Sequence, residues 1–176
     1  MLNFKKKTVK NLCLIGLMGS GKSVIGRDLS RALNTNFIDT DYEIEKEAGM
    51  SINSIFKKYG EVYFRNLEEK ICVKVLKKID CVISLGGGSI LNKNIRNTIK
   101  ENSCSIFLNV DIDIILNRIK HSNKRPLLDN KDKKKTLENL YKERIKYYKK
   151  CDLVLSNNLD RKELVRKIKS EIIRYE

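Results

Sequence analysis

The chain has 176 residues and carries 37 Lys and Arg against 22 Asp and Glu, a formal net charge of +15. This length predicts one domain, residues 1–176, that buries a core without disulfides or metals, and it is too short for a motor or a large switch ATPase. Five cysteines without a C-x-x-C pair argue against a zinc or disulfide framework and favour a reducing compartment. No apolar stretch is long enough to span a membrane. We therefore expect a cytoplasmic protein with no membrane partner, and we expect a monomer.

Short apolar runs alternate along the chain with longer segments of helical periodicity. Strands are predicted at 11–15, 36–38, 81–85, 104–109 and 152–155, and helices at 22–33, 61–79, 111–120, 133–150 and 161–174, with one more helix beginning near Tyr42. Such alternation predicts a parallel sheet covered on both faces. The expected fold is therefore α/β and three-layered, with a five-stranded parallel sheet.

The first predicted strand runs directly into the segment 16–23, Gly-Leu-Met-Gly-Ser-Gly-Lys-Ser, and a predicted helix follows it. Strand, glycine-rich turn and helix are the context that a phosphate-binding loop requires, so the expected three-layer fold is of the P-loop NTPase type. Lys22 can reach the β- and γ-phosphates of a nucleoside triphosphate, and the Ser23 hydroxyl can ligate Mg²⁺. The predicted ATP contacts in this loop are Gly19, Ser20, Gly21, Lys22, Ser23 and Val24. The alternative is a tight turn whose sequence matches the motif by chance.

Two further polar segments follow predicted strands. Asp39-Thr40-Asp41 comes after the second strand and Gly86-Gly87-Gly88 after the third. Because ligands bind beyond the carboxyl ends of parallel strands, both should meet the phosphate loop in one crevice. The polar stretch near 119–132 contains Pro126, the one proline of the sequence, and is expected to be a lid that excludes water from phosphoryl transfer.

Together these motifs resemble the shikimate kinase family over about residues 11–158. The matching segments are Gly16–Ser23 with Gly26-Arg27, Phe37–Asp41, Phe64-Arg65 with Glu68, Leu85–Gly88, Arg125–Leu128, and Arg144 four residues before Tyr148. The resemblance implies phosphorylation of the 3-hydroxyl of shikimate by ATP with Mg²⁺, giving shikimate 3-phosphate and ADP in aromatic amino-acid biosynthesis. A related kinase that acts on another polyol acid, such as gluconate, remains the alternative.

The resemblance also assigns catalytic roles. It places Asp41 against the substrate hydroxyl, as the group that orients it or accepts its proton, and Arg125 over the transferring phosphate when the lid closes. Asp39 approaches Mg²⁺ through water beside Ser23, and Arg118 stacks on adenine. Without the resemblance, Thr40 or Asp41 could simply cap the helix near Tyr42, and Arg118 could simply favour a helix dipole.

The substrate region is expected at about 39–68 together with the triple glycine and Arg144. The resemblance makes Arg65 and Arg144 a clamp for the substrate carboxylate, since arginines bind carboxylates through charge-assisted hydrogen bonds. Glu68 lies three residues after Arg65 and can orient it on a helix. The resemblance makes Gly86, Gly87 and Gly88 a turn that lies against the substrate. Surface arginines, a helix-surface ion pair and a plain flexible turn are the corresponding structural alternatives.

The positive charge is concentrated between residues 118 and 150, which hold 13 Lys and Arg against 4 Asp and Glu. A basic segment can bind nucleic acid, and a nucleotide-binding scaffold protein is a second class of function. The sequence shows no recognition motif for nucleic acid and few aromatic residues. We therefore expect solvated lysines that help attract ATP and an anionic substrate, and no nucleic-acid partner.

Overall fold

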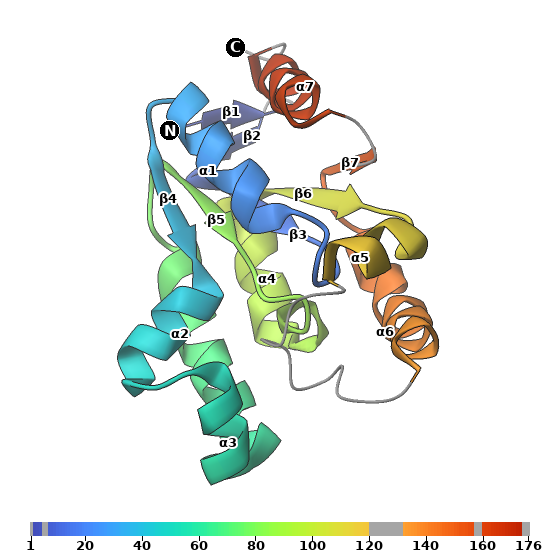
Figure 1. Ribbon diagram of the computed structural model, residues 1–176. Helices are drawn as coiled ribbons and strands as arrows, with labels where there is room; N and C mark the ends of the chain where they lie inside the picture. The colour runs from blue at the N-terminus through green and yellow to red at the C-terminus, as the bar shows by residue number, and fades with distance from the viewer. Residues whose placement is uncertain (1, 5–6, 120–131, 157–159, 174–176) are drawn as a thin grey trace.

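The computed structural model describes residues 2–4, 7–119, 132–156 and 160–173 (Figure 1). In these ranges five parallel strands form one sheet in the order β4-β5-β3-β6-β7. They are β3 (Asn11–Ile15), β4 (Asn36–Asp39), β5 (Cys81–Ser84), β6 (Ser103–Asn109) and β7 (Leu153–Ser156). The predicted five-stranded parallel sheet is confirmed. A small antiparallel sheet of β1 (Leu2–Phe4) and β2 (Lys7–Val9) was not predicted.

Both faces of the sheet are covered by helices, which makes the domain three-layered (Figure 1). Leu12 and Leu14 of β3 face α1 (Lys22–Ala32) and α7 (Arg161–Ile173), and all these elements contribute to one apolar cluster. Cys13 and Ile15 face the opposite layer. That layer contains α2 (Thr40–Ala48), α3 (Ile52–Leu76), α4 (Lys93–Asn102), α5 (Ile112–Ile119) and α6 (Lys133–Tyr148). Because alternate side chains enter two apolar layers, the strands are continuously apolar in sequence.

The helix predicted at 61–79 is wrong at both ends. Helix α3 begins at Ile52, where the Ser51 hydroxyl accepts a hydrogen bond from the Ser54 amide, and it ends at Leu76. Gly60 interrupts it with φ 79° and ψ 176°, a conformation that favours glycine. The predicted start therefore coincides with a bend inside a longer helix, because a central glycine resembles a helix boundary in sequence.

Helix α4 was missed. It follows a single 3₁₀ turn, η1 (Ser89–Leu91), and Asn92 caps it by accepting from the amides of Asn94 and Ile95 at 2.8 and 3.1 Å. Its buried apolar residues are few and include Ile95 and Ile99, one turn apart. In the sequence this short stripe is hidden by Asn and Lys, which are common in loops.

The other predicted elements agree with the structure within two residues at each end. Residues 120–131, most of the predicted lid, lie outside the described residues, and so does Arg125. Among the helices that the structure describes, none is both long enough and apolar enough to cross a bilayer. The predicted single domain, cytoplasmic location and monomeric state stay predictions.

Candidate active site

A cavity of about 440 Å³ opens at the carboxyl ends of β3, β4 and β5. It brings together residues predicted at five separate places in the sequence: Ser23, Asp39, Asp41, Arg65, Gly86, Gly87, Gly88 and Arg144. Strand order explains the meeting, because β5 lies between β4 and β3 and the segments after all three strands share one edge. An apolar wall of Ile52, Phe56 and Phe64 completes the cavity, and the two phenylalanine ring centroids are 4.7 Å apart.

The phosphate-binding loop connects β3 to α1. Gly19 has φ 74° and Gly21, the N-cap of α1, has φ 91°, so both need the conformational freedom of glycine. Lys22 is buried, and its Nζ donates to the carbonyl oxygens of Gly16 at 2.9 Å and Leu17 at 2.8 Å. The loop thus holds a buried cation beside the positive N-terminus of a helix, an arrangement that binds polyphosphate.

The segment after β4 is held by main-chain and hydroxyl contacts. Asp39 caps α2 by accepting from the Asp41 amide at 3.1 Å, so the alternative that Thr40 or Asp41 supplies the cap is wrong. Thr40 is fully buried, donates to the Ser84 carbonyl at 3.1 Å and accepts from the Gly86 amide at 3.0 Å. This hydroxyl ties the end of β4 to the end of β5 and leaves the Asp41 carboxylate at the cavity.

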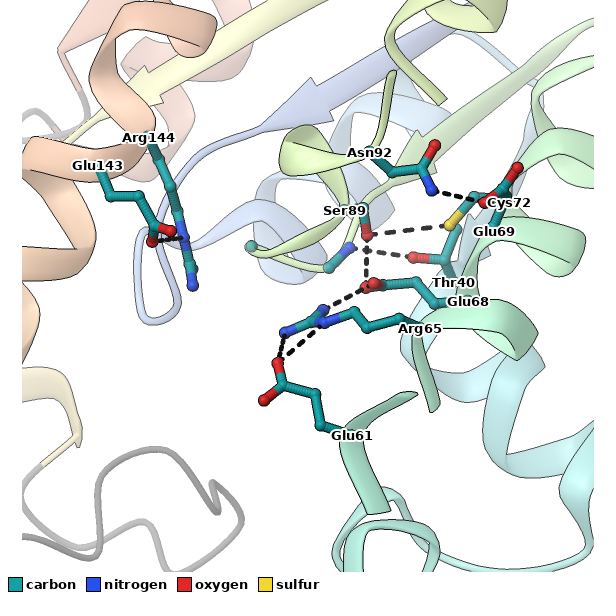
Figure 2. Close-up of polar contacts among 12 residues, drawn as sticks. Thr40, Glu61, Arg65, Glu68, Glu69, Cys72, Ser89, Asn92, Glu143 and Arg144 are labelled. Atoms are coloured by element: carbon teal, nitrogen blue, oxygen red, sulfur yellow. Dashed lines mark hydrogen bonds and ion pairs between the residues drawn. The ribbon is translucent and has the colours of Figure 1, made fainter. Parts of the chain in front are cut away.

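Arg65 is bracketed by two carboxylates of its own helix (Figure 2). Its Nη1 donates to Glu68 at 2.7 Å, while Nε and Nη2 donate to Glu61 at 3.2 and 3.1 Å. Burial by itself lowers the pKa of Arg65, but the charges and hydrogen bonds of Glu68 and Glu61 outweigh it and raise that pKa above its usual value. The predicted Glu68 contact is present, and the Glu61 contact was not foreseen.

The buried Glu68 carboxylate has a second partner from another element. Ser89, at the start of η1, donates to Glu68 Oε1 at 2.7 Å, and the Cys72 thiol lies 3.9 Å from the Ser89 hydroxyl oxygen (Figure 2). Burial raises the pKa of Cys72 to about 12, so this thiol stays protonated at neutral pH. Ser89 therefore links the turn after β5 to the carboxylate that orients Arg65.

The triple glycine lies close to side chains and backbone of other elements. None of the three glycines has a positive φ; a Cβ on Gly86 would lie 2.7 Å from Asp41 Oδ1, and one on Gly88 would lie 2.7 Å from Arg65 Nη1. A Cβ on Gly87 would lie 3.2 Å from the Met18 amide nitrogen in the phosphate loop. Asp41, Arg65 and the phosphate loop therefore pack closely against this turn, which would not hold for a plain flexible turn.

Arg144 enters the cavity from α6, on the side opposite Arg65 (Figure 2). Its side chain is only 3% exposed, its Nε lies 3.6 Å from Glu143 Oε2, and among the described residues this Nε has no hydrogen-bond partner. One turn later, the Tyr148 hydroxyl donates to the Gly87 carbonyl at 2.7 Å. Burial raises the pKa of Tyr148, so the hydroxyl remains a donor, and it fixes the triple glycine relative to Arg144.

Other predicted contacts are placed less centrally. Arg118 Nη1 lies 3.5 Å from the Gly19 carbonyl oxygen, at the rim of the phosphate loop, and Val24 is exposed. Sequence reasoning missed four residues that do not line the cavity but hydrogen-bond to residues that do: Thr40, Ser84, Ser89 and Glu61. The only sequence signal for the first three was their position beside predicted strand ends.

Oxygen ligands for Mg²⁺ are available where the sequence predicted them. Ser23 and Asp39 both line the cavity, and Ser23 Oγ lies 3.5 Å from Ser84 Oγ. Mg²⁺ prefers oxygen, keeps several waters and is usually held by one or two protein groups and substrate phosphates, which a sparse set of hydroxyl and carboxylate oxygens fits. The described residues contain no cluster of three or more His, Cys, Asp or Glu that would replace those waters.

A phosphate-binding loop, two arginines and a carboxylate around one cavity define a P-loop phosphotransferase for a small anionic acceptor. The family model of shikimate kinase matches residues 18–174. A shikimate kinase of Bartonella henselae is 40% identical over 154 residues, which cover 88% of this chain and 73% of that protein. The protein belongs to the shikimate kinase family.

Solved structures agree with this assignment. The shikimate kinase from Acinetobacter baumannii in complex with shikimate has a TM-score of 0.91 and 31% identity, and the match covers 95% of this chain and 94% of that one. A gluconokinase from Sinorhizobium meliloti, at 15% identity and a TM-score of 0.56, shares the fold alone over 96% of this chain and 94% of that one.

Proposed function

We propose that this chain transfers the γ-phosphoryl group of ATP to the 3-hydroxyl of shikimate, giving shikimate 3-phosphate and ADP. The observation that carries the proposal is the single cavity in which Ser23 of the phosphate loop meets Asp41, Arg65 and Arg144. Shikimate is a carboxylate with three hydroxyls, so it needs a cationic clamp at one end and polar contacts at the other. The cavity supplies both, and the phosphate loop lies at the hydroxyl end.

Arg65 and Arg144 bind the substrate carboxylate from opposite walls. Glu68 and Glu61 fix Arg65 on its Nη1, Nε and Nη2 atoms, so little side-chain freedom is lost when substrate binds. Arg144 presents a buried guanidinium from α6. A ring held between them at the triple glycine directs its hydroxyls toward Asp41.

Asp41 orients the reacting hydroxyl and takes up its proton as the new phosphorus–oxygen bond forms. Phosphoryl transfer depends mainly on positioning and on stabilising charge on the equatorial oxygens. Lys22 supplies part of that charge when its Nζ turns from the carbonyls of Gly16 and Leu17 to the phosphates. Arg125 supplies the rest of this positive charge from the lid, and Arg118 contacts the adenine.

Mg²⁺, bound to the nucleotide, would be held by Ser23 directly and by Asp39 through water, and would neutralise phosphate charge. Ser84 lies next to Ser23, at the end of β5, where it can position a water of that shell. The protein's own contribution is to place these oxygens at the edge where β3, β4 and β5 end.

A coupled assay of ADP release with Mg-ATP tests the proposal, with shikimate, gluconate or no acceptor. Turnover with shikimate alone is expected. Turnover with gluconate, or ATP binding without turnover on either acid, would contradict it. In the second case, polynucleotide affinity that falls steeply with salt would indicate that the basic surface serves nucleic acid instead.

A further inference from the structure

A second cavity, of about 240 Å³, lies between α4 and the end of α6. It shares no lining residue with the substrate cavity described above. Its wall includes Ile90 of η1, Arg96 and Lys100 of α4, and Tyr147, Lys150 and Asp152 at the end of α6 and beyond. Neither the proposed reaction nor the core packing uses these charged side chains.

Arg96 is held rigidly at this cavity. Its Nη1 donates to the carbonyl oxygens of Ile90 at 2.8 Å and Leu91 at 2.7 Å, and its guanidinium carbon lies 4.3 Å from the centroid of the Tyr147 ring. Among the described residues, neither Nε nor Nη2 of Arg96 has a hydrogen-bond partner. A half-buried guanidinium that is fixed on one edge and has donors left on the other is preorganised to bind a carboxylate.

The surrounding charges also favour an anion. Lys100 and Lys150 are exposed residues of the lining, so three cations face one carboxylate, Asp152. That carboxylate is already engaged, because its Oδ2 accepts from the Ser105 amide at 2.8 Å and from the Ser105 hydroxyl at 2.7 Å. The net positive lining attracts a ligand of negative charge and disfavours a cation.

Much of the rest of the lining is apolar, with Asn97 and Ser105 as its uncharged polar members. Ile15, Ile90 and Ile99 and the Tyr147 ring give the cavity a hydrophobic surface beside the guanidinium. Its volume is below that of a typical drug-sized site, so it suits a single ring. We propose that the cavity between α4 and α6 is a second binding site, specific for a small carboxylate with a flat apolar body.

Calorimetric titration with benzoate tests this proposal, with benzamide as the neutral analogue of nearly the same shape. Saturating shikimate is present throughout, so that benzoate does not report on Arg65 and Arg144. The unmodified protein should bind benzoate and not benzamide. Arg96→Met should weaken benzoate binding by about tenfold, since a charge-assisted pair is lost, and the exposed Lys150→Gln by about threefold.

Lys142→Gln, an exposed lysine of α6 that does not line the cavity, is the matched control and should bind benzoate normally. Circular dichroism melts show whether Arg96→Met is folded, because this variant also loses the two carbonyl contacts. If Arg96→Met is not folded, the benzoate affinity of Lys150→Gln and the comparison of benzoate with benzamide test the proposal instead. The variants locate the site whether or not the proposed kinase activity holds. Equal binding of benzoate and benzamide, no benzoate binding, or benzoate affinity unchanged in Lys150→Gln would overturn the proposal.

Discussion

The Ser89 hydroxyl donates a 2.7 Å hydrogen bond to Glu68 Oε1, and the other oxygen of Glu68 accepts from Arg65 at 2.7 Å. Both Ser89 and Glu68 are buried, whereas Arg65 reaches the substrate cavity. The turn that follows the triple glycine therefore positions an arginine on a different element. In a buried site such a link matters, because an unpaired carboxylate oxygen is costly.

Ser89→Ala should raise the KM for shikimate by several-fold, leave the KM for ATP unchanged, and lower the free energy of unfolding by about 1–3 kcal/mol. The reason is that Glu68 loses one of its two partners and holds Arg65 less firmly. Steady-state kinetics with each substrate varied and a denaturant titration measure these effects. Ser30→Ala is the control, because it removes a buried hydroxyl that, within the described part of the chain, hydrogen-bonds to the Arg27 carbonyl of its own helix α1. An equal change in both KM values would rule out a positioning role for Ser89.

Glu61→Gln should lower the KM for shikimate, by up to about threefold at low ionic strength, with kcat unchanged. Glu61 is largely exposed, so its pair with Arg65 adds little stability, while its charge competes with the substrate carboxylate for the same guanidinium. The difference should disappear in high salt, which screens exposed charges. Glu47→Gln, which removes a comparable exposed carboxylate beside Lys70, should have no effect. A higher KM in Glu61→Gln would mean that Glu61 orients Arg65 more than it competes.

Arg144→Ala should raise the KM for shikimate by about two orders of magnitude, because a clamp of charge-assisted hydrogen bonds contributes about 2–3 kcal/mol. Arg144→Lys should lie between this variant and the parent, since it keeps the charge but loses the planar fork. Lys142→Ala on the same helix is the exposed control. A KM within threefold of the parent in Arg144→Ala would refute the clamp.

Asp41→Asn should lower kcat by about 10²-fold or more, as expected for loss of a proton acceptor. ATP affinity, measured separately by titration with a non-hydrolysable analogue, should stay the same, whereas Lys22→Met should lose it. The cap of α2 comes from Asp39, so Asp41→Asn should also melt normally. A variant that melts early while it keeps its kcat would make Asp41 a structural residue.

Alkali should destabilise the fold above about pH 9, the usual pKa of a cysteine thiol. Burial raises the pKa of Cys72 to about 12 and that of Cys81 to about 11, so between pH 9 and these values the unfolded chain has lost protons that the folded chain keeps. Stability is therefore complete below pH 9 and falls as the pH rises. Guanidinium titrations at pH 8 and pH 10 measure the fall, and Cys72→Ala should make it smaller. A stability that is equal at both pH values would contradict this account.

The sequence by itself determined the class of fold and predicted many of the residues that line the cavity. Alternating apolar runs and helical periods predicted the parallel sheet, because the two patterns depend only on which side chains each face buries. The phosphate loop could be predicted for a similar reason, because local backbone geometry determines where its glycines and Lys22 must lie. Asp39, Asp41 and the triple glycine were predicted together because parallel strands end at one edge.

Only the tertiary structure decided how distant side chains pair. Ser89 and Glu68 are 21 residues apart and Thr40 and Gly86 are 46 apart, and nothing in their local sequence specifies these hydrogen bonds. Likewise, Asp41 and Arg65 approach the triple glycine from other elements, and no local turn preference predicts this close packing. Helix α4 and the first half of α3 were missed because they are stabilised by packing of a few apolar side chains against the sheet layer, and such packing is a long-range property.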